Sequence, residues 1–558
     1  MRRVLVVLMA ALVLATMSVG LVSAAKPLPK LVLLSGDSQI ARLYAQGVQE
    51  MIRKNLGLPI EIEAVDFKTR LQKMRNKDFQ IVFAGWGADY DDPMTFLDMW
   101  VTDGPFNDVM WSNPSYDKLI DVAKTSSDEA VRMKAMSQAE KILIGEMPIA
   151  PLYWPAWNYV EHPYVKNVIR KTVGSDYEWK WAYTEGRPGG DKDQFLRLNF
   201  GEEPPDLDPA TSTDQVSFWV INATYEGLAR KNPEMKVLPG SGLAESWTVS
   251  KDRKVYTFKL RDAKWSDGVA VTAYDFEYGW KRAIDPRTAS QYAYMMYVIK
   301  NAEKVNGMEV PDDKDPKKAE KNKAIDDALA TVGVKALDAK TLRVELEAPT
   351  PFFLDLITFI TYMPSPKHMV EKLGDEYASE VDKMVACGPF KVSKWQHEYK
   401  IILEKNPNYW DAKSVKLQRI EADMIKDIAT PLNMFDAGEL DFVGVPGTYI
   451  DQYRNKGMKT IAEATSWYLE FNCKHEIFKN AKVRKAFSLA IDRQAYVDYV
   501  LKNGSLPATS LVPPTIHGKD GVSFHDVYVG DLLPTKADVK LAKQLLAEGL
   551  AELGYAMP

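Results

Sequence analysis

Phe79–Ala84 (FQIVFA) runs directly into Gly85–Pro93 (GWGADYDDP), and this stretch decides the fold class. The first six residues form an apolar run of strand length. The nine residues that follow hold two glycines, two aromatic residues and three aspartates. In open α/β sheets, ligands bind beyond the carboxyl ends of the strands. The stretch therefore predicts a buried strand that ends in a binding loop.

The residues before this strand repeat an alternation of strand and helix. Leu31–Leu34 is a short apolar run, and apolar side chains then recur at helical spacing over 40–52 until Gly57 ends the helix. Ile60–Ala64 alternates as a second strand, and a short basic helix is expected over Thr69–Arg75. This alternation predicts an α/β fold, with a parallel sheet covered by helices.

The rest of the chain indicates further domains. At 558 residues it is too long for one hydrophobic core, so two or three domains are expected. Gln194–Phe352 is rich in short strands and turns, and the charged stretch Asp312–Lys323 is expected to be a solvated loop or helix face. Thr535–Asp538 resembles a capping box at the start of a last helix, which Gly554 would end.

The N-terminus predicts export. Residues 1–25 read as a secretory signal peptide, with a basic start, an uncharged run over Val4–Val22 and small residues before Lys26. The run is also long enough for an uncleaved membrane anchor, but its small-residue end favours cleavage. No cysteine stands at this site, so a lipoprotein is not expected. The mature protein is expected to be periplasmic or extracellular.

Composition excludes several classes of function. The net charge is −5 without a basic stripe, so nucleic acid is not an expected partner. The six histidines lack metal-ligand spacing and no hydrolase or phosphate-loop motif is present, so no catalytic residue, metal or cofactor is predicted. Asp89, Asp91 and Asp92 leave open an acid pair or a calcium site. Cys387 and Cys473 could form one disulfide or remain two thiols.

Ten stretches together resemble the oligopeptide-binding proteins of ABC importers, the cluster-C proteins of extracellular solute-binding protein family 5. They are Asp206–Pro209, Tyr225–Leu228, Leu243–Trp247, Lys264–Gly268, Thr272–Phe276, Gly388–Lys391, Lys405–Trp410, Val483–Arg493, Gly85–Pro93 and Met147–Tyr153. The resemblance implies a periplasmic-binding-protein-like type II fold, with two hinged lobes and an extra third domain. It implies a monomeric receptor that captures short peptides and delivers them to an ABC importer permease.

The order of these stretches differs from that of the family. Stretches of the Gly85–Pro93 type lie near the family's C-terminus, whereas those of the Asp206–Pro209 type lie near its N-terminus. The chain therefore resembles a circular permutant whose old ends are joined through Gly186–Gln194. The resemblance implies three domains. Domain III (lobe 2) covers 28–156 and 469–558, domain I (lobe 1) covers 157–225 and 351–468, and domain II covers 226–350. The chain would cross between the lobes near Trp157 and near Tyr468.

The resemblance also implies roles for the loop after the first quoted strand. Asp89 matches a family acid that pairs with the α-ammonium of the peptide. A loop aspartate is otherwise a solvated acid or a turn cap, but the flanking loop favours the ligand role. Gly85 and Gly87 would let the backbone pair with the peptide main chain by strand addition, with plain turn chemistry as the alternative. Trp86 would form a wall of the cleft or pack in the core.

Four residues outside this loop match ligand-contacting positions of the family. Tyr292 would reach the ligand from domain II, while Thr213 and Asp214 would touch the peptide backbone from domain I. Some relatives have Glu in place of Thr213. Phe67 stands where many relatives have Trp, and it would keep an apolar pocket wall.

Two positions depart from the family pattern. Met74 and Phe83 stand where some relatives have arginines that meet the C-terminal carboxylate of the peptide. Arg75 is adjacent to Met74. We expect a weaker dependence on a free C-terminus, or another cation in that role.

Two other functions remain open. The same fold hosts other solutes, such as a nickel complex, a haem or an oligosaccharide, and a fold does not fix its ligand. A hydrolase or a chaperone-like envelope protein is a weaker alternative, because no specific motif supports it.

Overall fold

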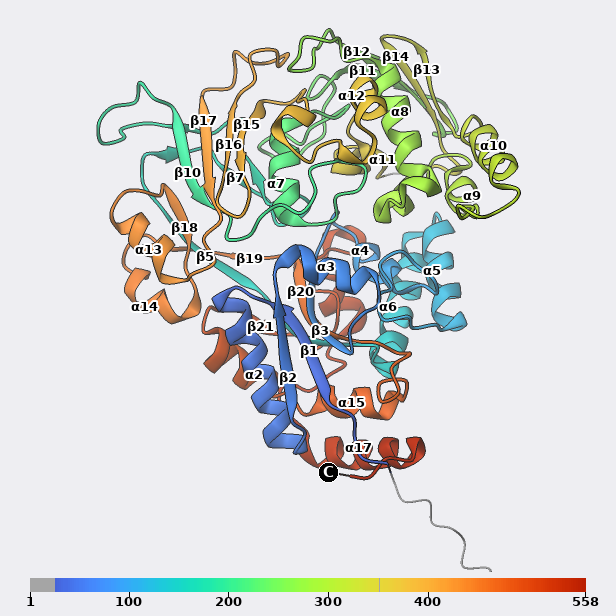
Figure 1. Cartoon of the computed structure of the whole chain (residues 1–558), viewed down its shortest axis with the longest axis vertical. Helices are drawn as coiled ribbons and strands as arrows, with labels where there is room; N and C mark the ends of the chain where they lie inside the picture. Colours follow the sequence, from blue (N-terminus) through green and yellow to red (C-terminus); the bar gives the residue numbers. More distant parts are fainter. Residues whose placement is uncertain (1–25, 351, 558) are drawn as a thin grey trace, which may run out of the picture.

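The largest sheet lies in the lower lobe of Figure 1, here lobe 2, and is mixed in direction. The computed structural model describes residues 26–350 and 352–557, so the predicted signal peptide over 1–25 lies outside it. The strand order is β2 (Ile60–Val65), β1 (Leu31–Gly36), β3 (Ile81–Gly87), β20 (Thr465–Phe471), β4 (Ile149–Trp154) and β21 (Leu506–Pro507). β1 pairs parallel with β2 and β3, as predicted, but the other pairings are antiparallel.

Helices cover this sheet and begin and end where the sequence provides caps. The longer ones are α2 (Gln39–Leu56), α3 (Phe67–Arg75), α5 (Pro114–Thr125), α6 (Glu129–Glu146), α15 (Ala481–Leu489) and α17 (Val539–Leu553). α2 ends at Gly57 and α17 at Gly554, both in the left-handed conformation that favours glycine. The predicted capping box at Thr535 is wrong, because Asp538 itself accepts the backbone N–H of Leu541.

The upper lobe of Figure 1, here lobe 1, contains two four-stranded sheets. One has the order β10 (Phe195–Asn199), β17 (Arg419–Asp423), β16 (Lys400–Lys405) and β15 (Phe390–Gln396). The other has the order β11 (Ala244–Val249), β12 (Val255–Leu260), β14 (Thr341–Glu345) and β13 (Val334–Asp338). The main helices of this lobe are α7 (Gln215–Thr224), α8 (Ala273–Ile284), α10 (Lys318–Leu329) and α12 (Lys367–Leu373). The charged stretch leads into α10, whose buried side chain is Ile325.

The lobes are joined where two chain segments cross side by side. A three-stranded sheet of β18 (Phe442–Gly444), β5 (Ala156–Glu161) and β19 (Lys459–Ala462) lies against lobe 1. The chain passes from β4 to β5 at Pro155 and from β19 to β20 at Glu463, and the backbone N–H of Glu463 donates to the Pro155 oxygen at 3.1 Å. Tyr468 is already inside β20, so the second crossing lies a few residues before it.

The two ends of the described chain meet beside α17. The N–H of Lys26 donates to the oxygen of Gly554, and the N–H of Ala556 donates to the oxygen of Lys26, both at 3.0 Å. The segment expected to be a linker forms a surface turn before β10, with positive φ at Gly189 and Gly190.

Both cysteines are free thiols, so no disulfide joins them: Cys387 is buried and Cys473 is half-buried. Within 26–350 and 352–557, no helix is long and apolar enough to cross a bilayer.

Candidate functional site

A cavity of about 280 Å³ lies between the lobes, next to the chain crossings. Its wall includes all eight residues singled out from the sequence: Phe67, Gly85, Trp86, Gly87, Asp89, Thr213, Asp214 and Tyr292. The first five come from lobe 2 and the last three from lobe 1. The fold thus brings together, across the cleft, positions that are up to 225 residues apart in the sequence (292 − 67).

The end of β3 forms one side of the cavity and has an unpaired edge. β3 pairs with β1 only through Ile81 and Val82, whereas on its other side it pairs with β20 as far as Gly87. A Cβ on Gly85 would lie 2.7 Å from the ring of Trp467, so this position requires glycine for packing. In the described chain, the backbone of Gly85–Gly87 is therefore free of a strand on its second edge and can accept an extended ligand.

Asp89 is an acceptor that lacks a full set of donors. Its side chain is 7% exposed, and its Oδ1 accepts a hydrogen bond from the Tyr292 hydroxyl at 3.0 Å. Its Oδ2 is buried without a hydrogen-bond partner among the described residues. Burial raises the pKa of Asp89 well above its ordinary value, against the opposing effect of the Tyr292 hydrogen bond. A ligand cation would supply the missing partner.

The neighbouring aspartates are engaged elsewhere. Asp91 accepts the backbone N–H of His517 at 2.9 Å and faces its ring, and Asp92 pairs with Arg132 at 2.9 Å. The described residues hold no group of three or more potential metal ligands. The acid pair and the calcium site left open by the sequence are therefore not formed.

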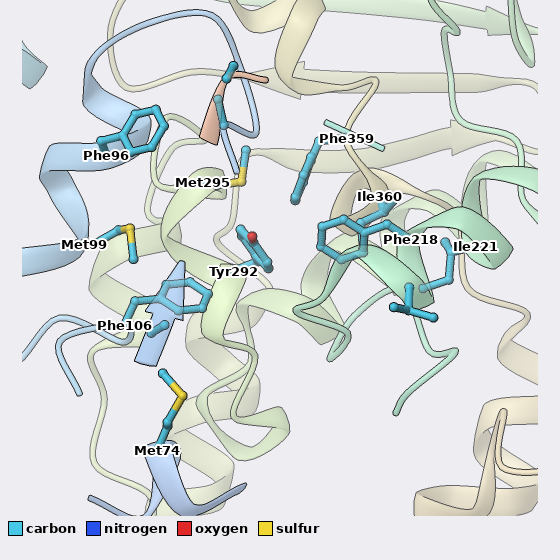
Figure 2. Close-up of a cluster of buried hydrophobic side chains, with 14 of the residues drawn as sticks. Met74, Phe96, Met99, Phe106, Phe218, Ile221, Tyr292, Met295, Phe359 and Ile360 are labelled. Atoms are coloured by element: carbon cyan, nitrogen blue, oxygen red, sulfur yellow. The ribbon is translucent and has the colours of Figure 1, made fainter. Parts of the chain in front are cut away.

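An aromatic cluster connects the lobes at the back of the cavity, with Tyr292 in its middle (Figure 2). The ring of Tyr292 lies 5.0 Å from Phe106 of lobe 2, and 4.9 Å from Phe359 and 6.0 Å from Phe218 of lobe 1. Trp86 lines the cavity and also packs edge-on against Phe106, with their ring centroids 4.8 Å apart. Phe106 was not singled out from the sequence, because no motif surrounds it.

Two arginines of α3 are the basic residues in the cavity wall. Arg70 donates from Nη1 to the Phe83 oxygen at 2.8 Å, and Arg75 donates from Nη2 to Thr213 Oγ1 at 2.6 Å across the cleft. Thr213 is thus already engaged by a protein group. Met74 also lines the cavity, and its neighbour Arg75 supplies a basic group beside it.

Asp214 is both a helix cap and a cavity residue. Its Oδ1 accepts the backbone N–H of Ser217 at 2.9 Å at the start of α7, and burial raises its pKa to about 7. The ring of Phe67 lies 5.2 Å from the Arg70 guanidinium and lines the cavity.

The sequence did not single out four further carboxyl groups of the wall: Asp108, Asp176, Glu463 and Glu470. They come from a loop, a hairpin, a chain crossing and the end of β20. No local pattern marks them, because only the tertiary arrangement brings them to one cavity.

Two lobes that close on a cavity beside paired chain crossings define a type II periplasmic-binding-protein-like α/β fold, the class shared with two solved structures. The substrate-binding domain of an oligopeptide ABC transporter from Bacillus anthracis matches at 35% identity and a TM-score of 0.56, over 65% of this chain and 68% of that one. Listeria monocytogenes OppA bound to peptide matches at 32% identity and a TM-score of 0.56, over 65% of this chain and 69% of that one.

Sequence comparison gives the family. The profile of the bacterial extracellular solute-binding proteins, family 5 Middle, matches residues 11–108 and 239–556, and the chain belongs to this family. The oligopeptide-binding protein OppA of Bacillus subtilis is 39% identical over 382 residues, 67% of this chain and 65% of that protein. The chain thus spans about 65% of the length of this curated relative.

Proposed function

We propose that this chain is an exported receptor that captures short peptides and delivers them to the permease of an ABC importer. The observation that carries the proposal is Asp89, whose buried Oδ2 lacks a donor among residues 26–350 and 352–557, at the end of a strand whose second edge is free of a described strand. A peptide supplies both missing groups, an α-ammonium for the carboxylate and an extended main chain for the edge.

The other cavity residues have supporting roles in this proposal. Trp86, Tyr292 and Phe67 form walls around the peptide, and the start of α7 at Thr213 and Asp214 contacts its backbone. Arg70 and Arg75 are the cations available to the C-terminal carboxylate of the peptide. They take the place of the arginines that some relatives have at the positions of Met74 and Phe83. A free C-terminus then contributes to affinity.

Binding is coupled to closure of the lobes about the two crossings. The open state dominates without ligand, and a peptide that contacts both lobes favours the closed state, because only that state makes both sets of contacts. The proposal includes three domains, a cleaved signal peptide without lipid attachment, a monomer in solution and no enzymatic activity. The cleft's roomy pockets would hold water and tolerate many side chains.

Mass spectrometry tests this function. Protein purified under native conditions is measured intact and then after denaturation, so that co-purified ligands are released and identified. A ladder of short peptides, present with the native chain and lost with Asp89→Asn, supports the proposal. Asp91→Asn is the matched control, because it removes the same charge two residues away from a half-exposed position outside the cavity.

Other outcomes would redirect the assignment. A single metal complex, haem or sugar would keep the fold and replace the ligand class. Turnover of a bound peptide would support the hydrolase instead. A chain purified without ligand would be titrated with a peptide library, and a lack of binding there would contradict the proposal.

A further inference from the structure

The cavity wall carries more carboxyl groups than basic groups. Its carboxyl groups are Asp89, Asp108, Asp176, Asp214, Glu463 and Glu470, against the two guanidinium groups of Arg70 and Arg75. Asp108 has its own partner in the ammonium of Lys77, and Asp214 caps α7. A peptide's α-ammonium and carboxylate cancel each other, so they leave this imbalance unchanged.

Two of these carboxyl groups lie at the hinge without a basic partner. Asp176 lies just before β8 (Tyr177–Glu178) and accepts from Trp219 Nε1 at 3.2 Å. Glu463 forms the crossing between β19 and β20, and its carboxyl group makes no hydrogen bond within the described chain. Neither is in a salt bridge with a described Lys, Arg or His. The charge of Lys171 acts on the Asp176 carboxyl group through space, but its ammonium lies 3.7 Å from Glu178 and outside the cavity wall.

Independently of the charge count, three acceptors of the cavity wall are buried without a donor among the described residues, and two donors of the wall, Arg70 Nε and Trp86 Nε1, are buried there without an acceptor. Asp89 and Glu470 are 7% and 3% exposed, and Asp89 Oδ2 and Glu470 Oε2 are buried without a hydrogen-bond partner among the described residues. The amide oxygen of Gln215, in the same wall, is also buried and unpartnered there. Acceptors that are buried without donors are costly, and a ligand that brings several N–H groups removes that cost.

We propose that Asp176 and Glu463 form a subsite for a basic side chain, so that the cleft prefers peptides that carry lysine or arginine. The inference rests on the proposed peptide receptor and specifies its substrate class. A buried cation is stable only when it is paired and hydrogen-bonded, and two carboxylates in one cavity wall can provide both. The result is a preference rather than a requirement, because both carboxyl groups can stay protonated when a neutral side chain occupies the subsite.

The protonation of the pair gives a second signature. Burial raises the pKa of Asp176 to about 7, and burial with the nearby charge of Asp176 raises the pKa of Glu463 to about 8. A bound ammonium lowers both values, so binding a basic peptide at pH 7 releases protons. The affinity for a basic peptide therefore rises from pH 6 to pH 8 more steeply than the affinity for a neutral one.

Calorimetric titration with a lysine scan tests the subsite. The probes are trialanine with lysine at each position in turn and the same peptides with uncharged norleucine, at pH 7 in two buffers of different ionisation enthalpy. The native chain is expected to bind one lysine peptide at least about 10-fold more tightly than its norleucine match, a difference of about 1.4 kcal/mol. That peptide is also expected to release the extra protons.

Variants locate the effect. Asp176→Asn with Glu463→Gln keeps the shape of the wall and is expected to reduce the lysine preference to about 2-fold, well below the native 1.4 kcal/mol, while norleucine binding persists. Asp262→Asn with Glu309→Gln is the control, because it removes two equally charged groups from exposed positions of lobe 1.

The outcomes separate the two proposals. If norleucine peptides bind and no lysine peptide binds more tightly, the basic subsite is wrong while the peptide receptor stands. A lysine preference that survives the double variant also overturns the subsite. If neither series binds the native chain, the peptide receptor itself fails, and the subsite with it.

Discussion

The hydroxyl of Tyr292 donates a hydrogen bond to Asp89 Oδ1 at 3.0 Å across the cleft, joining a short helical turn of lobe 1 to the loop that ends β3 of lobe 2. This contact holds the aspartate in place with one oxygen engaged, while the other has no partner in the part of the chain that the structure describes. The two lobes therefore meet at the residue that we assign to the ligand ammonium, so closure and recognition are coupled at one carboxyl group.

Tyr292→Phe is expected to weaken peptide binding without unfolding the protein. A hydrogen bond to a charged group contributes about 1.5 to 3 kcal/mol, so Kd for trialanine should rise about 10-fold or more. Tyr294→Phe is the control, because the hydroxyl of Tyr294 is buried and makes no hydrogen bond within the described chain. Equal calorimetric affinities for the two variants would contradict the role of the contact.

The ion pair between Asp37 and Lys426 connects the lobes at the other side of the cleft. Lys426 Nζ lies 2.9 Å from Asp37 Oδ1 and 3.5 Å from Glu202. Both partners are partly exposed, so the pair contributes at most about 1 kcal/mol. Lys426→Met should therefore shift the ligand-free protein toward the open state and raise Kd by about 2- to 5-fold. Small-angle scattering without ligand should give a larger radius of gyration, and an unchanged curve would argue against the contact as a latch.

Glu140 on α6 predicts a pH-dependent stability that is independent of the cleft. It is fully buried, its Oε1 accepts the N–H groups of Leu511 and Val512, and burial raises its pKa to about 7. Between its ordinary pKa near 4.3 and this value, the folded state holds a proton that the unfolded state has lost. Its stabilising contribution is therefore present below pH 4 and is lost as the pH rises through 7.

Urea unfolding of the native chain and of Glu140→Gln at pH 5 and pH 8 measures this contribution. The native chain should lose about 2 kcal/mol relative to the variant over that range. Glu129→Gln, an exposed change on the same helix, should follow the native chain. A difference that does not depend on pH would contradict a proton held by Glu140.

The sequence could single out candidate residues where they stand together in one local stretch. Gly85, Trp86, Gly87 and Asp89 end or follow one apolar strand, and ligands of open α/β sheets bind beyond the carboxyl ends of strands. Asp176 and Glu463 could not be found in this way, since a hairpin and a chain crossing approach each other only in the folded protein.

The fold shows the same division. The parallel pairing of β1, β2 and β3 follows from alternating strands and helices, whereas β20 and β4 join the same sheet from distant parts of the chain. Their antiparallel direction depends on the crossings at the hinge, which no local pattern records. The start of α17 shows the same limit for a helix cap. Thr535 and Asp538 have the spacing of a capping box, but only Asp538 caps the helix, by accepting the backbone N–H of Leu541.

Reordering the chain tests the proposed circular permutation. Lys26 is hydrogen-bonded to Gly554 and Ala556, so a linker of about four residues can join these ends, each residue spanning up to about 3.5 Å. New ends can be opened between Gly189 and Gly190, in a surface turn where a Cβ on either residue would meet nothing within 4 Å. We expect the reordered chain to fold cooperatively and to bind trialanine with a Kd within about 2-fold of the native value, because every contact of the cavity is kept. The control is the native chain with the same linker inserted after Gly189. If this control folds and the reordered chain does not, the present order is required for folding.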